Sequence, residues 1–248
     1  MARFLITGST DGLGRATAET LLDDGHDVVV HARSAPRADA VADLTGRGAD
    51  LVVVDLADRE AVLAAARGLD AGPPIDGVVH NAGVLSGPAV IPVNVVAPYL
   101  FTALLGSPTR HVYLSSGMHR GGSARLAGVD WSGTSATNSY SDSKLFVTTL
   151  AAAVAARWPG VQANAVDPGW VPTKMGGAGA SDDLELGHRT QERLISDPAA
   201  TSSGGYWFHD RQRDPHPAVL DAGFQDELLR ALEDATGVAL PVRPPRGR

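Results

Sequence analysis

Residues 3–14 read Arg-Phe-Leu-Ile-Thr-Gly-Ser-Thr-Asp-Gly-Leu-Gly, and a helical pattern of apolar residues follows directly. The first of them predict a short strand, Arg3–Thr7, and the rest a loop that contains Gly8, Gly12 and Gly14. Glycines let a backbone turn sharply and approach a pyrophosphate closely, and the positive end of the following helix attracts its charge. The spacing differs from the common GxGxxG pattern, but the strand before and the helix after favour a phosphate-binding turn over an ordinary glycine-rich turn.

The same alternation of short β-branched runs and longer Ala/Leu-rich stretches continues along the chain, which indicates βαβ units and a parallel sheet. Further strands are expected at Asp27–Ala32, Ala49–Val54, Gly77–His80, His111–Ser115 and Gln162–Val166. Helices are expected at Leu13–Asp24, Ala35–Thr45, Arg59–Gly68, Val93–Leu104 and Ser141–Trp158. The predicted fold class is α/β: a single-domain Rossmann fold over residues 1–240, with a doubly wound parallel sheet of about seven strands and helices on both faces.

The regular order weakens after Pro168. A segment rich in Gly, Asp and Ser precedes a predicted helix at Leu184–Leu194, and a second Ser/Gly run precedes Tyr206–Phe208. We interpret residues 174–218 as a substrate-loop region over the carboxyl edge of the sheet, where open α/β folds place ligands. A last helix is expected at Ala222–Thr236, and residues 241–248, with three prolines and three arginines, are expected to form a flexible C-terminal tail.

Composition excludes several classes of protein. The chain has 248 residues, a net charge of -7 and no cysteine, which excludes disulfides, thiolate metal sites and a cysteine nucleophile. The negative charge argues against a nucleic-acid or anionic-membrane partner, and no apolar run is long enough for a membrane helix. With no leader pattern at the start, a cytoplasmic enzyme is expected. The eight histidines show no metal-ligand spacing, so no metal is expected, and a serine hydrolase is disfavoured because the chain lacks a Gly-x-Ser-x-Gly elbow.

The end of the second strand favours one coenzyme over another. A Rossmann site that accepts NAD offers a carboxylate to the ribose 2′-hydroxyl at this point, whereas this chain has Arg33. A guanidinium can pair with a 2′-phosphate, and Arg15 could add charge, so NADP(H) is expected over NAD(H). The alternative is that Arg33 is a solvated loop arginine.

A tyrosine and a lysine open the long helical pattern that follows the fifth strand. Tyr140 and Lys144 are four residues apart and therefore share a helical face. A positive charge near a phenol favours the phenolate and lowers its pKa toward the working pH, as acid–base catalysis requires. Ser115 and Ser116 end one strand, and Asp167-Pro168-Gly169 end another, so polar groups from both are expected at the carboxyl edge of the sheet.

These motifs together resemble the short-chain dehydrogenase/reductase superfamily over roughly the first 175 residues. The glycine motif matches Thr7–Gly14, the Asn-Ala-Gly motif matches Asn81–Gly83, the Tyr-x-x-x-Lys motif matches Tyr140 and Lys144, and the Pro-Gly strand end matches Pro168-Gly169. The resemblance implies that Ser116 orients the substrate oxygen, that Tyr140 transfers its proton, and that Lys144 grips the nicotinamide ribose. Ser115 is an alternative to Ser116.

The resemblance also assigns the remaining site residues. Asn94 resembles the helix asparagine that anchors a water in the proton relay of the family, the alternative being a helix-capping or kink residue. Asp55 and Leu56 resemble the pair that holds adenine, and Thr173 the hydroxyl residue at the nicotinamide carboxamide. The full set expected to bind the coenzyme is Gly8, Ser9, Thr10, Gly12, Leu13, Gly14, Arg15, Arg33, Asp55, Leu56, Asn81, Ala82, Gly83, Tyr140, Lys144, Pro168, Gly169, Val171 and Thr173.

Two spacings depart from the common family pattern. Only 12 residues separate Asn81 from Asn94, which implies a shortened fourth helix with an altered dimer surface. Between Ser116 and Tyr140 lie 23 residues, a spacing similar to the retinol-dehydrogenase-like branch, and the added stretch with His119 and Trp131 is expected to form a pocket wall. Large apolar residues expected near the substrate are Met118, Trp131, Trp170, Met175, Tyr206, Trp207 and Phe208. They favour a hydrophobic carbonyl substrate, unless they fill the core or a dimer contact.

The sequence thus predicts an NADP(H)-dependent oxidoreductase that interconverts a carbonyl compound and its alcohol by hydride transfer. The expected partner is a small hydrophobic molecule, with no nucleic acid and no membrane, and a homo-oligomer is left open. The alternative is a catalytically silent, nucleotide-sensing regulatory protein with the same fold.

Overall fold

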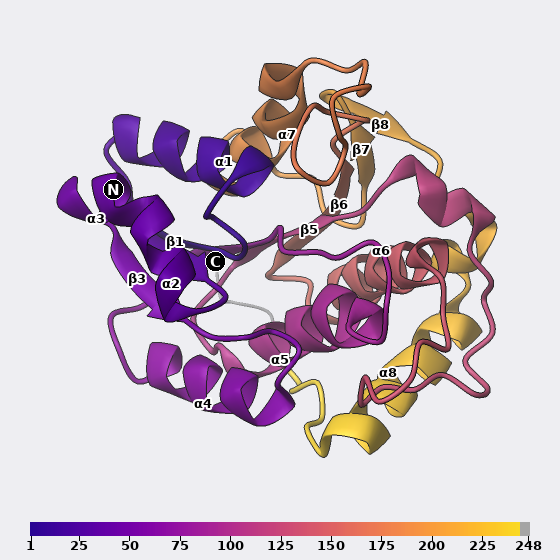
Figure 1. Ribbon diagram of the computed structural model, residues 1–248. Coiled ribbons are helices and arrows are strands. Elements are labelled where there is room, and N and C mark those ends of the chain that lie inside the picture. Colours follow the sequence, from indigo (N-terminus) through magenta and orange to yellow (C-terminus); the bar gives the residue numbers. More distant parts are fainter. Residues whose placement is uncertain (244–248) are drawn as a thin grey trace.

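The computed structural model describes residues 1–243 of the 248-residue chain. Those residues contain one sheet with the strand order β3-β2-β1-β4-β5-β6-β7-β8 (Figure 1). The strands are β1 Arg3–Ile6, β2 Asp27–Ala32, β3 Asp50–Val53, β4 Gly77–His80, β5 Arg110–Leu114, β6 Gln162–Asp167, β7 Tyr206–Phe208 and β8 Arg211–Arg213. Strands β1 to β7 run parallel, and β8 is antiparallel to β7. The predicted Rossmann-type α/β fold with about seven parallel strands is confirmed.

Helices cover both faces of this sheet. Helices α1 and α7 pack together on one face, while α4 packs on α5 and α6 packs on α8 on the other (Figure 1). The α-helices are α1 Gly12–Asp23, α2 Ala35–Ala38, α3 Ala42–Gly46, α4 Arg59–Asp70, α5 Ala97–Leu104, α6 Tyr140–Arg157, α7 Leu184–Ser196 and α8 Ala222–Thr236. The shorter turns are η1 Asp39–Val41, η2 Pro92–Val96, η3 Gly117–Gly121 and η4 Pro217–Leu220.

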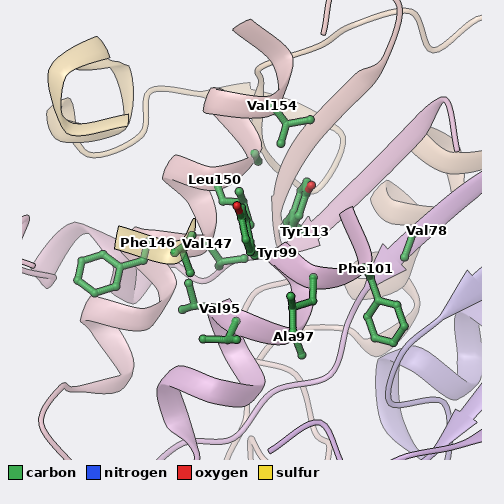
Figure 2. Close-up of a cluster of buried hydrophobic side chains, with 14 of the residues drawn as sticks. Val78, Val95, Ala97, Tyr99, Phe101, Tyr113, Phe146, Val147, Leu150 and Val154 are labelled. Carbon is green, nitrogen blue, oxygen red and sulfur yellow. The ribbon is translucent and has the colours of Figure 1, made fainter. Parts of the chain in front are cut away.

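Side chains of the central strands alternate between two separate cores. Leu5, Val29 and Val78 lie in register on β1, β2 and β4, and all three belong to the core under α4, α5, α6 and α8. Figure 2 shows part of that core, in which side chains of α5 and α6 lie beside Val78 of β4 and Tyr113 of β5. Phe4 and Ile6 point to the opposite face, into the core under α1 and α7. Burial on both faces explains why these strands are nearly continuous apolar runs.

Two predicted helices differ from the observed structure. The expected helix Ala35–Thr45 is divided into α2, η1 and α3, because the backbone at Val41 (φ -122°, ψ 15°) leaves the helical region. The expected helix Val93–Leu104 begins with the π-helical turn η2, in which the N–H of Ala97 donates to Pro92. Pro98 has no N–H to donate to the carbonyl of Asn94 four residues earlier, so the regular α-helical pattern cannot continue through this point.

Part of the predicted substrate-loop region belongs to the sheet. Tyr206–Phe208 form β7, which pairs with β6, and a tight turn at His209 and Asp210, both with positive φ (45° and 60°), leads into β8. Neither strand was expected from the sequence, because each has only three residues. The hairpin extends the sheet beside the end of β6.

The end of the described chain is held against the domain. The indole N–H of Trp158 donates to the carbonyl of Pro241 (2.7 Å), and the guanidinium of Arg243 lies 4.1 Å over the Trp158 ring. Residues 244–248 of the predicted flexible tail lie outside the described residues, and the domain boundary at residue 240 stays a prediction. Among residues 1–243, no helix has both the length and the apolar character needed to cross a bilayer.

Candidate active site

A cleft of about 550 Å³ opens at the carboxyl edge of the sheet, around the end of β1. The strand order reverses here, because β2 lies on one side of β1 and β4 on the other, which is where doubly wound sheets bind nucleotides. The lining residues come from the glycine loop, the ends of β2, β3 and β4, and the segment after β6: Gly8, Thr10, Asp11, Gly12, Leu13, His31, Arg33, Arg37, Asp55, Leu56, Ala57, Asn81, Ala82, Gly83, Val84, Ala89, Val93, Thr173, Lys174 and Met175.

The glycine loop has the backbone that its sequence predicts. Gly8 (φ 69°) and Gly12 (φ 55°) are in the left-handed region that favours glycine. Gly14 has an ordinary φ, but a Cβ there would overlap the Asn81 amide and the Gly8 carbonyl. The loop can therefore turn into α1 only with glycines at these positions, and it leaves the first N–H groups of the helix facing the cleft.

Two polar side chains hold the glycine loop from behind. The Asn81 amide donates to the carbonyls of Thr7 (2.9 Å) and Gly8 (3.1 Å). His31 accepts the Gly8 N–H at Nδ1 (2.8 Å), and its Nε2 donates to the carbonyl of Val54 (2.8 Å). Burial lowers the pKa of His31, which keeps the imidazole neutral and Nδ1 an acceptor. Ser9 is fully buried and bonds to Ile6 and His31, so its side chain supports the loop and does not face a ligand.

The charged residues at the mouth of the cleft divide into two groups. Arg33 is exposed at the end of β2 and lines the cleft, as predicted. Arg15 lies outside the cleft, because its guanidinium pairs with Glu19 and Asp43 along α1 and α3. Arg37, which no sequence motif indicated, also lines the cleft and donates to Asp11 (2.7 Å).

Asp11 also forms an ion pair with Lys174 (2.8 Å). Its carboxylate, on the glycine loop, therefore links α2 to the segment after Thr173. The two cations lower the pKa of Asp11, although its partial burial opposes them.

Helix α6 begins at Tyr140 because Ser139 and Asp142 form a capping box there. One turn later Lys144 is only 4% exposed, and its ammonium donates to the carbonyl of Leu114 (2.6 Å) and lies 5.4 Å from the centre of the Tyr140 ring. A Cβ added to Gly83, which lines the cleft, would lie 3.6 Å from Lys144 Nζ. The ammonium of Lys144 therefore lies between Gly83, at the end of the cleft, and the Tyr140 ring.

The two candidate serines at the end of β5 point in different directions. Ser115 is buried, and its hydroxyl bonds to Thr148 inside α6 (2.6 Å). Ser116 is partly exposed, caps η3 by accepting the N–H of Met118 (3.2 Å), and lies close enough to Tyr140 to lower the pKa of the phenol. The geometry favours Ser116 over Ser115 as the partner of the phenol.

Burial has the largest influence on the pKa values of Tyr140 and Lys144. It raises the pKa of Tyr140 to about 12, against the hydrogen bond from Ser116 and together with the negative charge of Asp167. Burial lowers the pKa of Lys144 to about 8, against the attraction of the same carboxylate. This differs from the sequence-based expectation of a phenol with a lowered pKa, because the lysine ammonium is engaged with a carbonyl and desolvation disfavours the phenolate. In the protein alone, the Tyr140 hydroxyl is therefore protonated at neutral pH.

Asn94 lies in the π-helical turn and connects two segments of the site. Its side chain exchanges hydrogen bonds with both backbone groups of Val84 (2.9 and 3.0 Å) and donates to the hydroxyl of Ser143 (2.9 Å). Ser143 in turn donates to the carbonyl of Tyr140 (2.7 Å). The side chain therefore ties the loop after β4 to the first turn of α6.

Of the remaining predicted residues after β6, some line the cleft and others pack behind it. Thr173 and Met175 line the cleft, whereas Pro168, Gly169 and Val171 do not. Gly169 (φ 82°) has no room for a Cβ beside Asp182, and Val171 is buried against Gly187.

The aromatic residues expected near the substrate are dispersed. Trp207 packs against the core under α1 and α7, on the opposite face of the sheet from Tyr206, and Trp131 packs on Phe146. His119 and Tyr206 are buried against each other, with ring centres 4.5 Å apart. The exposed members of the set are Met118, Trp170 and Met175.

Comparisons with known proteins agree with this arrangement. The family model described as short chain dehydrogenase matches residues 2–104. Short-chain dehydrogenase chyC of Penicillium rubens is 36% identical over 257 aligned residues, covering 97% of this chain and 100% of the relative. A solved structure of an uncharacterised protein from Mycobacterium paratuberculosis has a TM-score of 0.80 at 24% identity, covering 97% and 95% of the two chains. A short chain dehydrogenase from Shigella flexneri, solved with NADP, has a TM-score of 0.67 at 23% identity, covering 85% of this chain and 97% of the other.

Proposed function

This chain belongs to the short-chain dehydrogenase/reductase family, and on that premise we propose that it interconverts a carbonyl compound and its alcohol with NADP(H), using Tyr140 as the proton-transfer group. One observation carries the proposal. The cleft at the glycine loop extends to Gly83, and Lys144 lies beside that glycine. Tyr140 lies next to Lys144, and Ser116 lies next to Tyr140. A nucleotide site and a proton donor are thereby adjacent.

The residues of the cleft suit a nicotinamide dinucleotide. Gly8, Gly12 and Gly14 leave a cradle at the start of α1 that a Cβ would fill, and helix N-termini bind phosphate. Asp55 and Leu56 line the part of the cleft next to β3, where the family resemblance puts adenine. Thr173 and Lys144 would hold the nicotinamide end.

The preference for NADP(H) rests on charge. No carboxylate follows β2; instead Arg33 is exposed at the cleft and Arg37 lies one helical turn beyond it. Two guanidinium groups can pair with a 2′-phosphate, whereas a ribose hydroxyl gives them little to bind. The bound NADP of the Shigella flexneri relative is consistent with this assignment.

The chemistry divides between the coenzyme and the side chains. The coenzyme, when bound, supplies the hydride that reaches the carbonyl carbon in reduction or accepts it in oxidation. Ser116 and Tyr140 donate hydrogen bonds to the carbonyl oxygen, which stabilises the negative charge that develops there. Tyr140, whose raised pKa keeps it protonated, gives its proton to that oxygen as the alcohol forms. Lys144 holds positive charge beside the phenol and favours its ionised form after proton transfer.

A silent nucleotide sensor with this fold is not favoured, because Ser116, Tyr140 and Lys144 are present together and in contact range. For the substrate, the exposed Met118, Trp170 and Met175 support a molecule with an apolar part.

The decisive experiment measures coenzyme oxidation. Purified protein is mixed with NADPH, and separately with NADH, against a panel of aliphatic and aromatic ketones and aldehydes, and the fall in reduced coenzyme and the alcohol product are both followed. Turnover with NADPH supports the proposal. Tight coenzyme binding without turnover of any panel member would favour the sensor.

A further inference from the structure

Asp167 is an acidic residue at the reacting end of the site that the proposed chemistry does not use. It is the last residue of β6, and alternation along the strand puts it on the same face as Ala163 and Ala165, which lie in the core under α6. Its Oδ2 would be 3.1 Å from a Cβ added to Gly117, the residue after Ser116. A partly exposed carboxylate therefore lies beside the serine turn.

Two hydrogen bonds hold this carboxylate in place, and a third segment supports one of the donors. Tyr206 of β7, only 3% exposed, donates its hydroxyl to Asp167 Oδ2 (2.9 Å), and the N–H of Gly169 donates to Oδ1 (3.1 Å). The Tyr206 ring packs on His119, which donates from Nδ1 to the carbonyl of Ser116 (2.7 Å) and accepts the N–H of His216 at Nε2 (3.0 Å). Two hydrogen bonds leave lone pairs of the carboxylate unused, because an ionised carboxylate can accept about four.

The charges around Asp167 restrict what could approach it. Its charge acts on Lys144 and Tyr140 of α6, on His119 of η3 and on Tyr206 of β7, and Arg120 of η3 lies 5.7 Å from the centre of the Tyr206 ring. Its negative charge raises the pKa of both Tyr140 and Lys144. Lys144 and Arg120 already supply positive charge in this neighbourhood, so a cationic substrate group would be repelled by them. A neutral hydroxyl or N–H would meet a good acceptor without that repulsion.

We propose that Asp167 is a specificity residue, which accepts a hydrogen bond from a neutral hydroxyl or N–H group that the substrate carries close to its carbonyl. The inference rests on the proposed function and narrows its substrate class to hydroxyketones and related donor-bearing carbonyl compounds. Tyr206 fixes the carboxylate, and its partly exposed oxygens lie beside Gly117, the residue after Ser116. The apolar part of the substrate then lies toward Met118 and Trp170.

Matched ketone pairs test the inference on the unmodified protein. Benzoin is compared with deoxybenzoin, acetoin with butanone, and ortho-hydroxyacetophenone with acetophenone, all with NADPH. Hydrogen bonds to charged groups lead us to expect kcat/KM about 10- to 100-fold higher for the donor-bearing member of at least one pair. Equal kcat/KM within every pair overturns the inference but leaves the proposed function standing. Failure of all six ketones and of the wider panel overturns both.

The Asp167→Asn variant locates the effect. The amide keeps the shape of the side chain but removes the charge, so the preference within the responsive pair should fall to within about threefold of unity. Turnover of the ketone without the donor should change much less. An equal loss of kcat/KM for both ketones of the pair would mean that Asp167 only supports the fold, and the inference would be wrong. Coenzyme affinity and thermal melting are measured alongside, and the ketone pairs on the unmodified chain decide the matter if this variant does not fold.

Discussion

The coenzyme side and the substrate side of this molecule are built differently. From β1 to Gly83 the site is made by the backbone: glycines with positive φ, strand ends and the start of a helix, supported by Asn81 and His31 from behind. From β5 onward it is made by side chains, which meet from η3, α6, β6 and β7. The first kind of site depends mainly on its glycines and on the few side chains that support them, whereas the second depends on individual functional groups.

The largest effect is expected on the substrate side. Replacing Tyr140 with Phe removes the only proton donor that the mechanism uses, so kcat/KM for ketone reduction should fall by about 100- to 10,000-fold. Coenzyme affinity, measured by fluorescence titration, should stay within about twofold. Tyr113→Phe is the matched control, because that hydroxyl bonds to Thr102 in the core, away from the cleft, and turnover should persist. Unchanged turnover in Tyr140→Phe would contradict the assignment.

The second effect tests the backbone character of the coenzyme side. Gly14→Ala would push a methyl group into Asn81 and the Gly8 carbonyl, and the resulting shift of the loop should weaken coenzyme binding by about tenfold or more. Gly68→Ala is the control, since nothing lies within 4 Å of a Cβ there and the residue is exposed in α4. The control should stabilise the protein by about 0.5–1 kcal/mol with unchanged binding. If the two variants bind coenzyme equally well, the cradle is not where we place it.

A smaller effect concerns the one part of the coenzyme side that does depend on side chains. Arg33→Ala should reduce the ratio of kcat/KM with NADPH to that with NADH by about tenfold, because one guanidinium is lost from the expected 2′-phosphate site. Arg47→Ala is a fair control, as Arg47 pairs with Asp23 at the surface and does not line the cleft. A clear preference of the unmodified protein for NADH would show that the charge argument fails.

The last effect is on stability and not on activity, and it is expected at the boundary between the two regions, where His80 of β4 and His111 of β5 are buried with ring nitrogens 3.2 Å apart. Burial lowers the pKa of His80 well below its usual value and that of His111 to about 3. The pair is thus neutral when folded, and its stabilising contribution is complete above pH about 6.5, the ordinary histidine pKa, and is lost as pH falls toward 3. The free energy of unfolding should drop by up to about 1.4 kcal/mol per pH unit for each histidine.

Denaturant titrations across this range check that slope, and His111→Leu should make it shallower. An identical slope in the variant would exclude the pair as the cause.

The same division explains how much could be predicted from the sequence. The strands, the glycine loop and the pairing of Tyr140 with Lys144 follow from local patterns, since each depends on residues close together in the chain. Arg37 and Lys174 were missed because both are placed by ion pairs with Asp11, and these contacts join segments far apart in the chain. Asp167, Tyr206 and His119 form one cluster from three distant segments, and no spacing indicates it. A polar signal was available for His31, a histidine that follows three valines in β2.

The contacts of Asn94 have a consequence for mutational surveys of this enzyme. Through Ser143 it braces the backbone that carries the phenol, while it also fixes Val84 on the wall of the nucleotide cleft. A substitution there would loosen both halves of the site at once, and an activity screen would score the residue as though it took part in the reaction. Only separate measurements of coenzyme affinity and of the chemical step would distinguish this bracing role from the water-anchoring role that the family resemblance implies.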